Sequence, residues 1–157
     1  MKRILVVCTG NVCRTPMAEA LLRREVEQAG LSEQVSIDSA GVYAVVGGRA
    51  SQGSVNAMAE RYLDITDHRG KQLDFRLMDE ADLILVMEEG QRRSIFMNWP
   101  QALRKTFLLT EMAGEHADVE DPYGMEQAEY DKTAVIIEDY VSRGFPEILR
   151  RVGVSGD

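Results

Sequence analysis

Short apolar runs alternate along this chain with longer stretches in which apolar residues recur every three or four positions. The runs predict four strands, at residues 4–7, 35–38, 82–87 and 106–109. The longer stretches have the spacing of amphipathic helices, at residues 16–29, 54–63, 89–97 and 126–143. Strand and helix alternate, which predicts an α/β fold with a parallel sheet and helices on both of its faces.

Helix ends and loops can also be predicted from local signals. Thr15 is expected to cap the first helix, with Pro16 in its first turn and Gly30 just beyond its end. Gly144 and Pro146 are expected to break or bend the last helix. The connections at 40–53 and 111–125 are long enough to be functional loops.

Composition narrows the class of protein. The 157 residues, 45% hydrophobic and 28% charged, are typical of one folded domain spanning 1–157. The apolar run before Cys8 is too short for a signal peptide, and we expect a cytoplasmic protein with both cysteines as thiols and no membrane insertion. The net charge of −8 disfavours nucleic-acid binding, so an anionic substrate needs a local positive site.

Such a positive site is predicted in the segment Cys-Thr-Gly-Asn-Val-Cys-Arg-Thr, residues 8–15, which joins the first strand to the first helix. Loop N–H groups and the helix dipole meet at this point in doubly wound folds, and they stabilise both a phosphate and a thiolate. We therefore predict that Cys8 is an activated nucleophile and that Arg14 holds two phosphate oxygens. Gly10 permits the tight backbone of such a phosphate-binding loop.

Three alternatives to a catalytic phosphate-binding loop are possible for this segment. A lone cysteine at a strand end is usually a buried core thiol, but here glycine, arginine and threonine accompany it. A Walker phosphate loop would need a lysine that is missing. A zinc site can be written from both cysteines with His68 and His116, yet the spacing matches no familiar ligand pattern, so we predict no metal and no cofactor.

The chain resembles the low-molecular-weight protein tyrosine phosphatases, including their bacterial members. The resemblance rests on Cys8 to Pro16, on Asp-Pro-Tyr-Gly at 121–124, on Asp-Ser-Ala-Gly at 38–41 and on His68-Arg69. It implies a four-stranded parallel sheet, no metal, and a two-step phosphoric monoester hydrolysis through a cysteinyl-phosphate intermediate.

Three residues are predicted to be catalytic. Cys8 attacks phosphorus, Arg14 binds the phosphoryl oxygens, and Asp121 protonates the leaving oxygen and then serves as base for the attacking water. An Asp before Pro often only starts a turn, and Asp118 and Glu120 are rival acids near Asp121.

Other residues are predicted to bind substrate or to support the loop. Tyr123 is a candidate aromatic wall of the substrate pocket, and an ordinary half-exposed tyrosine is the alternative. Val45 stands where many animal members carry a tryptophan wall. The predicted substrate-binding set is Thr9, Gly10, Asn11, Val12, Cys13, Thr15 and Tyr123, and the set matching loop-supporting positions of the family is Asn11, Ser39 and His68.

Cys13 carries a separate hypothesis. On oxidation it can form a disulfide with Cys8 that protects the nucleophile, which would make the enzyme redox-sensitive. An equal alternative is that Cys13 is a small core residue.

The residue that carries the phosphate is the main open question. A related branch removes phosphate from arginine and has a threonine at the position of Val12, whereas tyrosine-directed members have an aliphatic side chain. Val12 cannot make the polar contact, which favours phosphotyrosine over phosphoarginine. The expected partners are phosphorylated proteins and a cognate bacterial kinase.

Two activities of other classes are less favoured. Arsenate reduction needs cysteines outside the loop, and this chain has none. A non-catalytic phosphopeptide-binding module should lack the nucleophile or the acid, yet both Cys8 and Asp121 are present.

Overall fold

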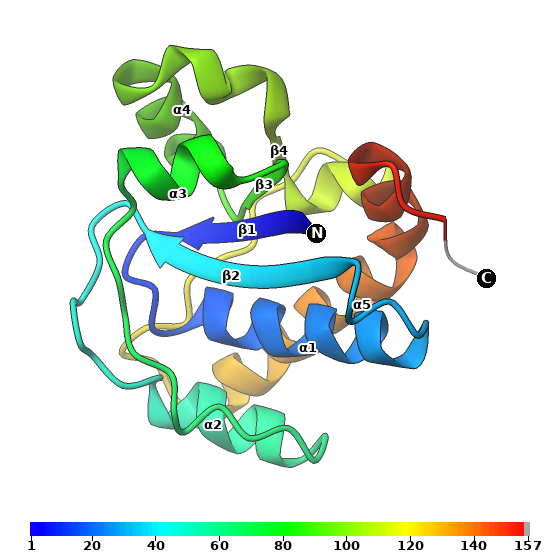
Figure 1. The fold of residues 1–157 in the computed structure, drawn as a ribbon. Coiled ribbons are helices and arrows are strands. Elements are labelled where there is room, and N and C mark those ends of the chain that lie inside the picture. The colour runs from blue at the N-terminus through cyan, green and yellow to red at the C-terminus, as the bar shows by residue number, and fades with distance from the viewer. Residues whose placement is uncertain (156–157) are drawn as a thin grey trace.

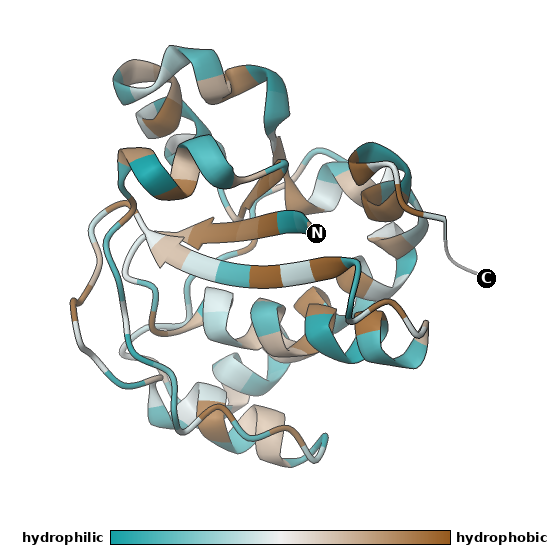
Figure 2. Cartoon of the chain, viewed as in Figure 1, coloured by the Kyte–Doolittle hydropathy of each residue, from teal (hydrophilic) through white to brown (hydrophobic). Residues whose placement is uncertain are grey.

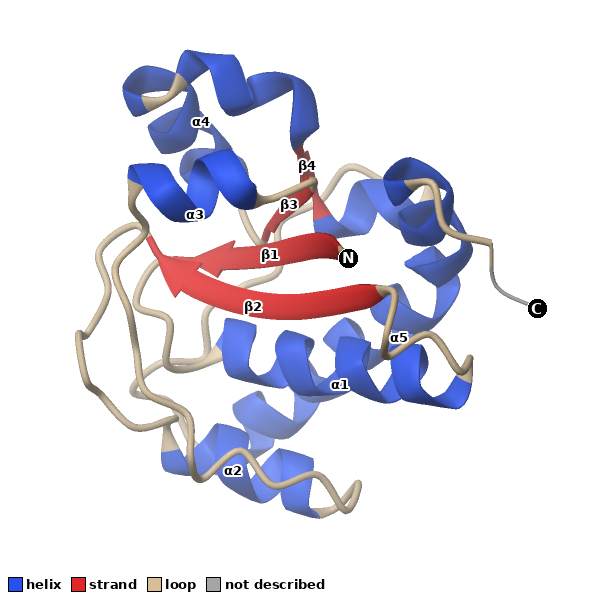
Figure 3. Ribbon diagram, viewed as in Figure 1, coloured by secondary structure: helices blue, strands red, loops and turns tan. Residues whose placement is uncertain are grey.

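A computed structural model describes residues 1–155, and the predicted domain end at 157 lies outside the described residues. The strands are β1 (Lys2–Cys8), β2 (Val35–Gly41), β3 (Leu83–Val86) and β4 (Thr106–Leu108). The helices are α1 (Arg14–Gln28), α2 (Gln52–Ala59), α3 (Phe75–Glu80), α4 (Glu89–Asn98) and α5 (Gln127–Val152). Two 3₁₀ helices, η1 (Pro100–Lys105) and η2 (Leu109–Ala113), flank β4 (Figure 3).

The strands form one parallel sheet in the order β2-β1-β3-β4, which confirms the predicted fold class. In β1, the residues from Ile4 to Cys8 are all buried, as expected for a strand with neighbours on both sides and helices on both faces. The last residue pairs at the carboxyl end of β1 determine which residues of β2 and β3 lie beside the site. Cys8 lies opposite Gly41 of β2, and Val7 lies opposite Val86 of β3.

Helices cover both faces of the sheet (Figure 1). Ile4, Val6 and Cys8 face a core shared with α1 and α5, whereas Leu5 and Val7 face a smaller core shared with α3 and α4. The alternation follows from the two-residue period of a strand. Figure 2 shows apolar residues concentrated along the strands and polar residues on the outer sides of the helices.

Gly144 and Pro146 were expected to break or bend the last helix, and a break is ruled out because α5 continues to Val152. Beyond Pro146 the helix buries Ile148, Leu149 and Val152. Burial of each such side chain is worth roughly 1.5–3 kcal/mol, which together exceeds the roughly 3 kcal/mol that a proline costs inside a helix. A Cβ at Gly144 would lie 2.8 Å from the Cβ of Met112, so this glycine lets α5 pack closely against η2.

The start of α1 and the presence of α3 also differ from the prediction. Thr15 is not the cap of α1: the helix begins at Arg14, and the capping position is Cys13, without a side-chain hydrogen bond. The hydroxyl of Thr15 is instead engaged by Cys8 and Asn11. The short helix α3 was not predicted, although Asp74 caps it by accepting a hydrogen bond from the Leu77 N–H.

The topology places the carboxyl ends of β1 and β3 side by side at a switch point. The chain leaves β1 toward β2 on one side, and later enters β3 on the other side of β1. Ligands of doubly wound folds bind outside such a point. The connections 42–51 and 60–74 run side by side at the same end of the sheet, joined by hydrogen bonds between Gly47, Gly48 and Gly70 (Figure 1).

Candidate active site

The loop between β1 and α1 turns its carbonyl groups outward. The carbonyls of Cys8, Thr9 and Gly10 accept hydrogen bonds from the N–H groups of Val42, Tyr43 and Val45 at 2.9–3.0 Å. Among residues 1–155, the N–H groups of residues 9–13 donate to no acceptor. With its carbonyls bound outside, the loop has a row of N–H groups free for an anion.

Gly41 allows the neighbouring strand to approach this loop. A Cβ on Gly41 would lie 2.4 Å from the Thr9 carbonyl oxygen and 3.1 Å from the Asn11 nitrogen. Any larger residue there would push the loop away from β2, which explains the glycine in the segment 38–41.

Asn11 fixes the conformation of the loop from behind. Its φ of 62° lies in the left-handed region, which asparagine tolerates better than most residues. The side chain is fully buried, and its amide donates to Thr15 Oγ1 at 2.8 Å and to Ser39 Oγ at 3.0 Å. Its Oδ1 accepts the Lys71 N–H at 2.8 Å. Every strong hydrogen-bonding group of the amide is thus used to hold one strained residue.

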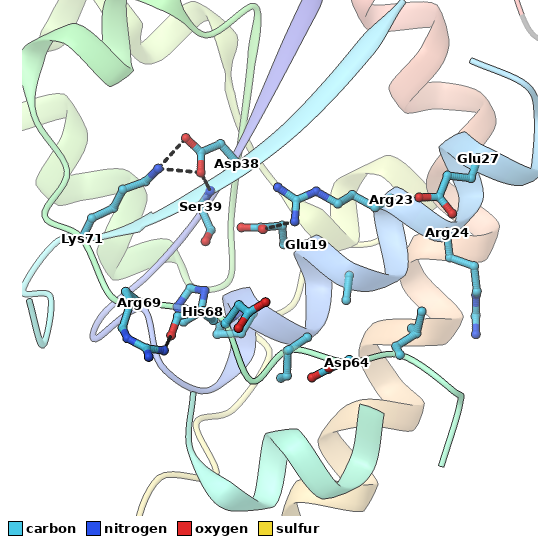
Figure 4. A pocket seen from close by; sticks show the side chains of 15 residues that line it. Glu19, Arg23, Arg24, Glu27, Asp38, Ser39, Asp64, His68, Arg69 and Lys71 are labelled. Atoms are coloured by element: carbon cyan, nitrogen blue, oxygen red, sulfur yellow. Dashed lines mark hydrogen bonds and ion pairs between the residues drawn. The ribbon is translucent and has the colours of Figure 1, made fainter. Parts of the chain in front are cut away.

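His68 and Ser39 both form hydrogen bonds with Asn11. Their side chains line a pocket that is shown in Figure 4. His68 Nε2 donates to the Asn11 carbonyl oxygen at 2.6 Å, since a carbonyl can only accept. Figure 4 also shows the Lys71–Asp38 ion pair, with 2.6 Å between Nζ and each carboxylate oxygen. This pair ties the His68–Lys71 segment to β2, where Ser39 lies.

Thr15 connects this brace to the thiol. The Thr15 Oγ1 lies 3.2 Å from Cys8 Sγ and accepts the hydrogen bond from Asn11. Because the Asn11 amide nitrogen can only donate, the single hydroxyl hydrogen of Thr15 is left for Cys8. Thr15 therefore donates a hydrogen bond to the Cys8 sulfur. Cys8 itself is 2% exposed, at the end of β1.

Arg14 is buried, and its guanidinium binds two groups that are distant in sequence. Its Nη1 donates to Glu88 Oε1 at 2.5 Å and to the Val119 carbonyl at 2.7 Å, while the side chain is 1% exposed. Glu88 supplies the charge that compensates the buried guanidinium. The Nε has no partner among residues 1–155. An unpaired buried N–H costs about 1–3 kcal/mol, so an anion in the cradle would satisfy it.

Asp121 is brought to the loop by Arg14. The distance between Arg14 Nη2 and Asp121 Oδ2 is 3.6 Å, and the other carboxylate oxygen accepts the Tyr123 N–H at 3.0 Å. The carboxylate is 41% exposed and therefore open to substrate. The Asp118 carboxylate instead accepts the Glu89 N–H at the start of α4.

The remaining predicted residues lie around the rim. Val12 is buried, and a Cβ on Gly10 would lie 3.6 Å from Val12 Cγ2 and 3.8 Å from Val45 Cγ2. Two apolar side chains thus flank this part of the loop. Tyr123 is 66% exposed, and its backbone N–H binds Asp121.

The Cys13 thiol contacts two hydroxyl groups. Its Sγ lies 3.0 Å from Ser51 Oγ and 3.7 Å from the Tyr130 hydroxyl. Burial raises the pKa of the Cys13 thiol above its ordinary value of 9.0, although the hydrogen bonds with Ser51 and Tyr130 oppose that effect. Both cysteines are free thiols.

Four residues that contact the loop or Arg14 were not predicted from the sequence: Glu88, Gln91, Ser51 and Tyr130. Glu88 and Gln91 directly follow the strand predicted at 82–87, so the rule that ligands bind at the carboxyl ends of strands was the signal for them. Ser51 and Tyr130 contact the loop only through the tertiary fold. Within residues 1–155 no three His, Cys, Asp or Glu side chains are placed to hold a metal ion. No helix of that part of the chain is long and apolar enough to cross a bilayer.

Comparison with known proteins gives a consistent result. A family model described as low molecular weight phosphotyrosine protein phosphatase matches residues 3–152. The low molecular weight protein-tyrosine-phosphatase Ptp of Acinetobacter johnsonii is 39% identical over 90% of this chain and 94% of its own length. A protein-arginine-phosphatase of Bacillus subtilis is 40% identical over 77% of this chain and 79% of its own. The crystal structure of a low molecular weight protein tyrosine phosphatase from T. tengcongensis superposes with a TM-score of 0.88 at 37% identity, covering 94% of this chain and 99% of the other.

Proposed function

The chain belongs to the low molecular weight phosphotyrosine protein phosphatases and is a phosphoric monoester hydrolase, and we propose that Cys8, Arg14 and Asp121 carry out its reaction on phosphotyrosine in proteins. The observation that carries this assignment is the buried Arg14, which joins the Cys8 loop to Asp121 and keeps an unpaired N–H. Nucleophile, anion site and acid thus meet at one end of the sheet.

In the first step the Cys8 thiolate attacks phosphorus, a sulfur–phosphorus bond forms, and the bond to the leaving oxygen breaks. Asp121 transfers its proton to that oxygen, so the tyrosine leaves as a neutral phenol. The loop N–H groups and Arg14 stabilise the phosphoryl oxygens in the transition state. The Thr15 hydroxyl, 3.2 Å from the sulfur, stabilises the thiolate before attack.

In the second step water attacks the cysteinyl phosphate. The Asp121 carboxylate takes the proton of that water, the sulfur–phosphorus bond breaks, and inorganic phosphate leaves. Thr15 again donates to the departing thiolate. The residue that gave the proton takes one back, so the enzyme returns to its starting state.

Substitution of Cys8 and of the three nearby acids tests these roles. Cys8→Ser should abolish hydrolysis of p-nitrophenyl phosphate while inorganic phosphate still binds, because the serine keeps the cradle but is a poor nucleophile. Asp121→Asn should lower kcat by roughly 100-fold or more, whereas Asp118→Asn and Glu120→Gln should leave it nearly unchanged. Hydrolysis that survives Cys8→Ser, or an equal loss at Asp118 or Glu120, would contradict the assignment.

The preference for phosphotyrosine rests on Val12. Its buried apolar side chain, with Val45 beside Gly10, supports contact with an aromatic ring and offers no hydrogen bond to a guanidinium. Phosphoarginine is the alternative, since a relative named protein-arginine-phosphatase is 40% identical. Matched peptides bearing phosphotyrosine or phosphoarginine measure the choice. A higher kcat/KM on phosphoarginine would reverse it, and Val12→Thr should shift the ratio toward phosphoarginine.

We also propose a cytoplasmic location, where thiols stay reduced, and a kinase of the same cell as the source of the phosphorylated protein.

Oxidation of Cys8 would inactivate the enzyme, because the nucleophile would be lost. Peroxide converts its thiolate to a sulfenic acid, and attack by the Cys13 thiol releases water and forms a disulfide. Peroxide-treated protein should regain activity with dithiothreitol, and Cys13→Ser should regain less; equal recovery by both would reject the disulfide.

A further inference from the structure

Gln91 is a buried polar residue at the active site that the catalytic steps above do not use. It lies in the first turn of α4 and is 2% exposed. Its Oε1 accepts two backbone hydrogen bonds, from Met87 N–H and Glu88 N–H, both at 2.9 Å. Its Nε2 donates to Thr9 Oγ1 at 3.2 Å. Gln91 therefore contacts both the β3–α4 turn and the Cys8 loop.

The orientation of the amide follows from its partners. Both backbone groups are donors, so the oxygen of the amide must face them, and the nitrogen must face Thr9. An amide can accept the two backbone bonds and donate to Thr9 at once, whereas a carboxylate could only accept and would need the Thr9 hydroxyl to turn and donate. The glutamine side chain matches all three partners at once.

Each partner of Gln91 leads to a different end of the catalytic loop. Thr9 directly follows the nucleophile Cys8. Glu88 binds Arg14 Nη1 at 2.5 Å, and Arg14 closes the loop. The hydrogen bond from the Glu88 N–H to Gln91 therefore fixes the backbone of Glu88, whose carboxylate holds the Arg14 guanidinium.

We propose that Gln91 is a positioning residue that sets the distance between the nucleophile end and the arginine end of the loop, through Thr9 and through Glu88. This rests on the proposed function of Cys8 and Arg14. Without Gln91, α4 loses the amide that caps its first turn, the Glu88 N–H loses its acceptor, and Thr9 loses its only side-chain hydrogen bond among residues 1–155. A misplacement of about 1 Å in a site of this kind can cost about 100-fold in rate.

The test compares Gln91→Leu, which removes all three hydrogen bonds at similar volume, with Thr9→Val and Thr9→Ser. Hydrolysis of p-nitrophenyl phosphate gives kcat and KM, and competitive inhibition by inorganic phosphate measures the anion site without chemistry. Gln91→Leu should lower kcat/KM roughly 10- to 100-fold and weaken phosphate inhibition. Thr9→Val should lose part of this activity and Thr9→Ser should keep it, because serine retains the hydroxyl.

Asp74→Ala is the matched control for a purely structural effect. Asp74 caps α3 through the Leu77 N–H and, within residues 1–155, forms no hydrogen bond or ion pair with residues 8–15, so its loss should lower thermal stability with unchanged kcat and phosphate inhibition. The proposal fails if Gln91→Leu behaves like Asp74→Ala. If Gln91→Leu does not fold, equal kinetics of Thr9→Val, Thr9→Ser and the parent overturn it. A parent protein without hydrolytic activity would instead reject the proposed function.

Discussion

Asn11 illustrates how much of the site depends on single residues. One buried side chain holds its own left-handed backbone, the Thr15 hydroxyl, Ser39 and the Lys71 segment. Loss of one partner leaves a buried polar group unpaired, which costs about 1–3 kcal/mol. The loop therefore keeps its shape without an anion, and little energy is needed to order it when phosphate binds.

At the same scale, Cys13 and Tyr130 should make the fold sensitive to alkali. Burial raises the pKa of Tyr130 above its ordinary 10.0, as it raises that of Cys13 above 9.0. When a folded-state pKa is raised, the unfolded chain loses its proton first, so stability is full below the unfolded pKa and falls as pH rises through the folded pKa. The free energy of unfolding should thus decline above about pH 9.

Urea unfolding between pH 7 and 10.5, in the presence of a reductant, measures this decline. Cys13→Ala should flatten the slope above pH 9, and Tyr130→Phe should flatten it nearer pH 10, because each removes one titrating group. Slopes identical to that of the parent would show that neither group titrates differently on folding.

Among the elements, α2 ends in an unusual way. Tyr62 has φ of 59°, and the bonds from Tyr62 N–H to Ala59 O and from Leu63 N–H to Met58 O form a Schellman-type helix ending. Glycine is the usual residue at the left-handed position, because a Cβ there costs about 1 kcal/mol. The Tyr62 side chain is 98% exposed, so packing does not offset that cost.

Tyr62→Gly should therefore raise the free energy of unfolding by about 0.5–1 kcal/mol, as measured by urea denaturation. Tyr62→Ala is the control, since it removes the ring but keeps the Cβ and should change stability little. A loss of stability in Tyr62→Gly alone would mean that the entropy of the unfolded chain outweighs the relief of strain.

For the whole molecule, charge decides how substrates approach. The net charge is −8, and three further acidic residues, Asp118, Glu120 and Glu129, line the same hollow as Asp121. An anionic phosphopeptide is repelled at long range and is attracted only near the loop N–H groups and Arg14. Phosphopeptides flanked by lysines should be cleaved faster than those flanked by glutamates.

Salt should reduce this preference. The screening length falls from about 30 Å at 0.01 M to about 8 Å at 0.15 M ionic strength, so the ratio of kcat/KM values for the two peptides should fall several-fold over this range. A ratio that does not change with salt would point to short-range contacts with the flanking residues instead of the overall field.

Local periodicity and residues adjacent along the chain were enough to predict the order of the four strands and of α1, α2, α4 and α5, and the parallel sheet. They also predicted the loop between Cys8 and Thr15. The short helix α3 was not predicted, and no break occurs at Pro146, because apolar burial along α5 outweighs the local tendency of proline to end a helix. A local signal indicates the conformation that a segment prefers, but tertiary packing can favour another conformation.

The distant groups that contact the loop could be identified only once the chain was folded. Glu88 and Val119 hold Arg14, Gln91 reaches Thr9, and Ser51 and Tyr130 hold the Cys13 thiol. None of these pairs is close in sequence, and no periodic pattern marks them. They meet because a parallel sheet brings the carboxyl ends of separate strands to one edge, where directional hydrogen bonds select partners by position in space.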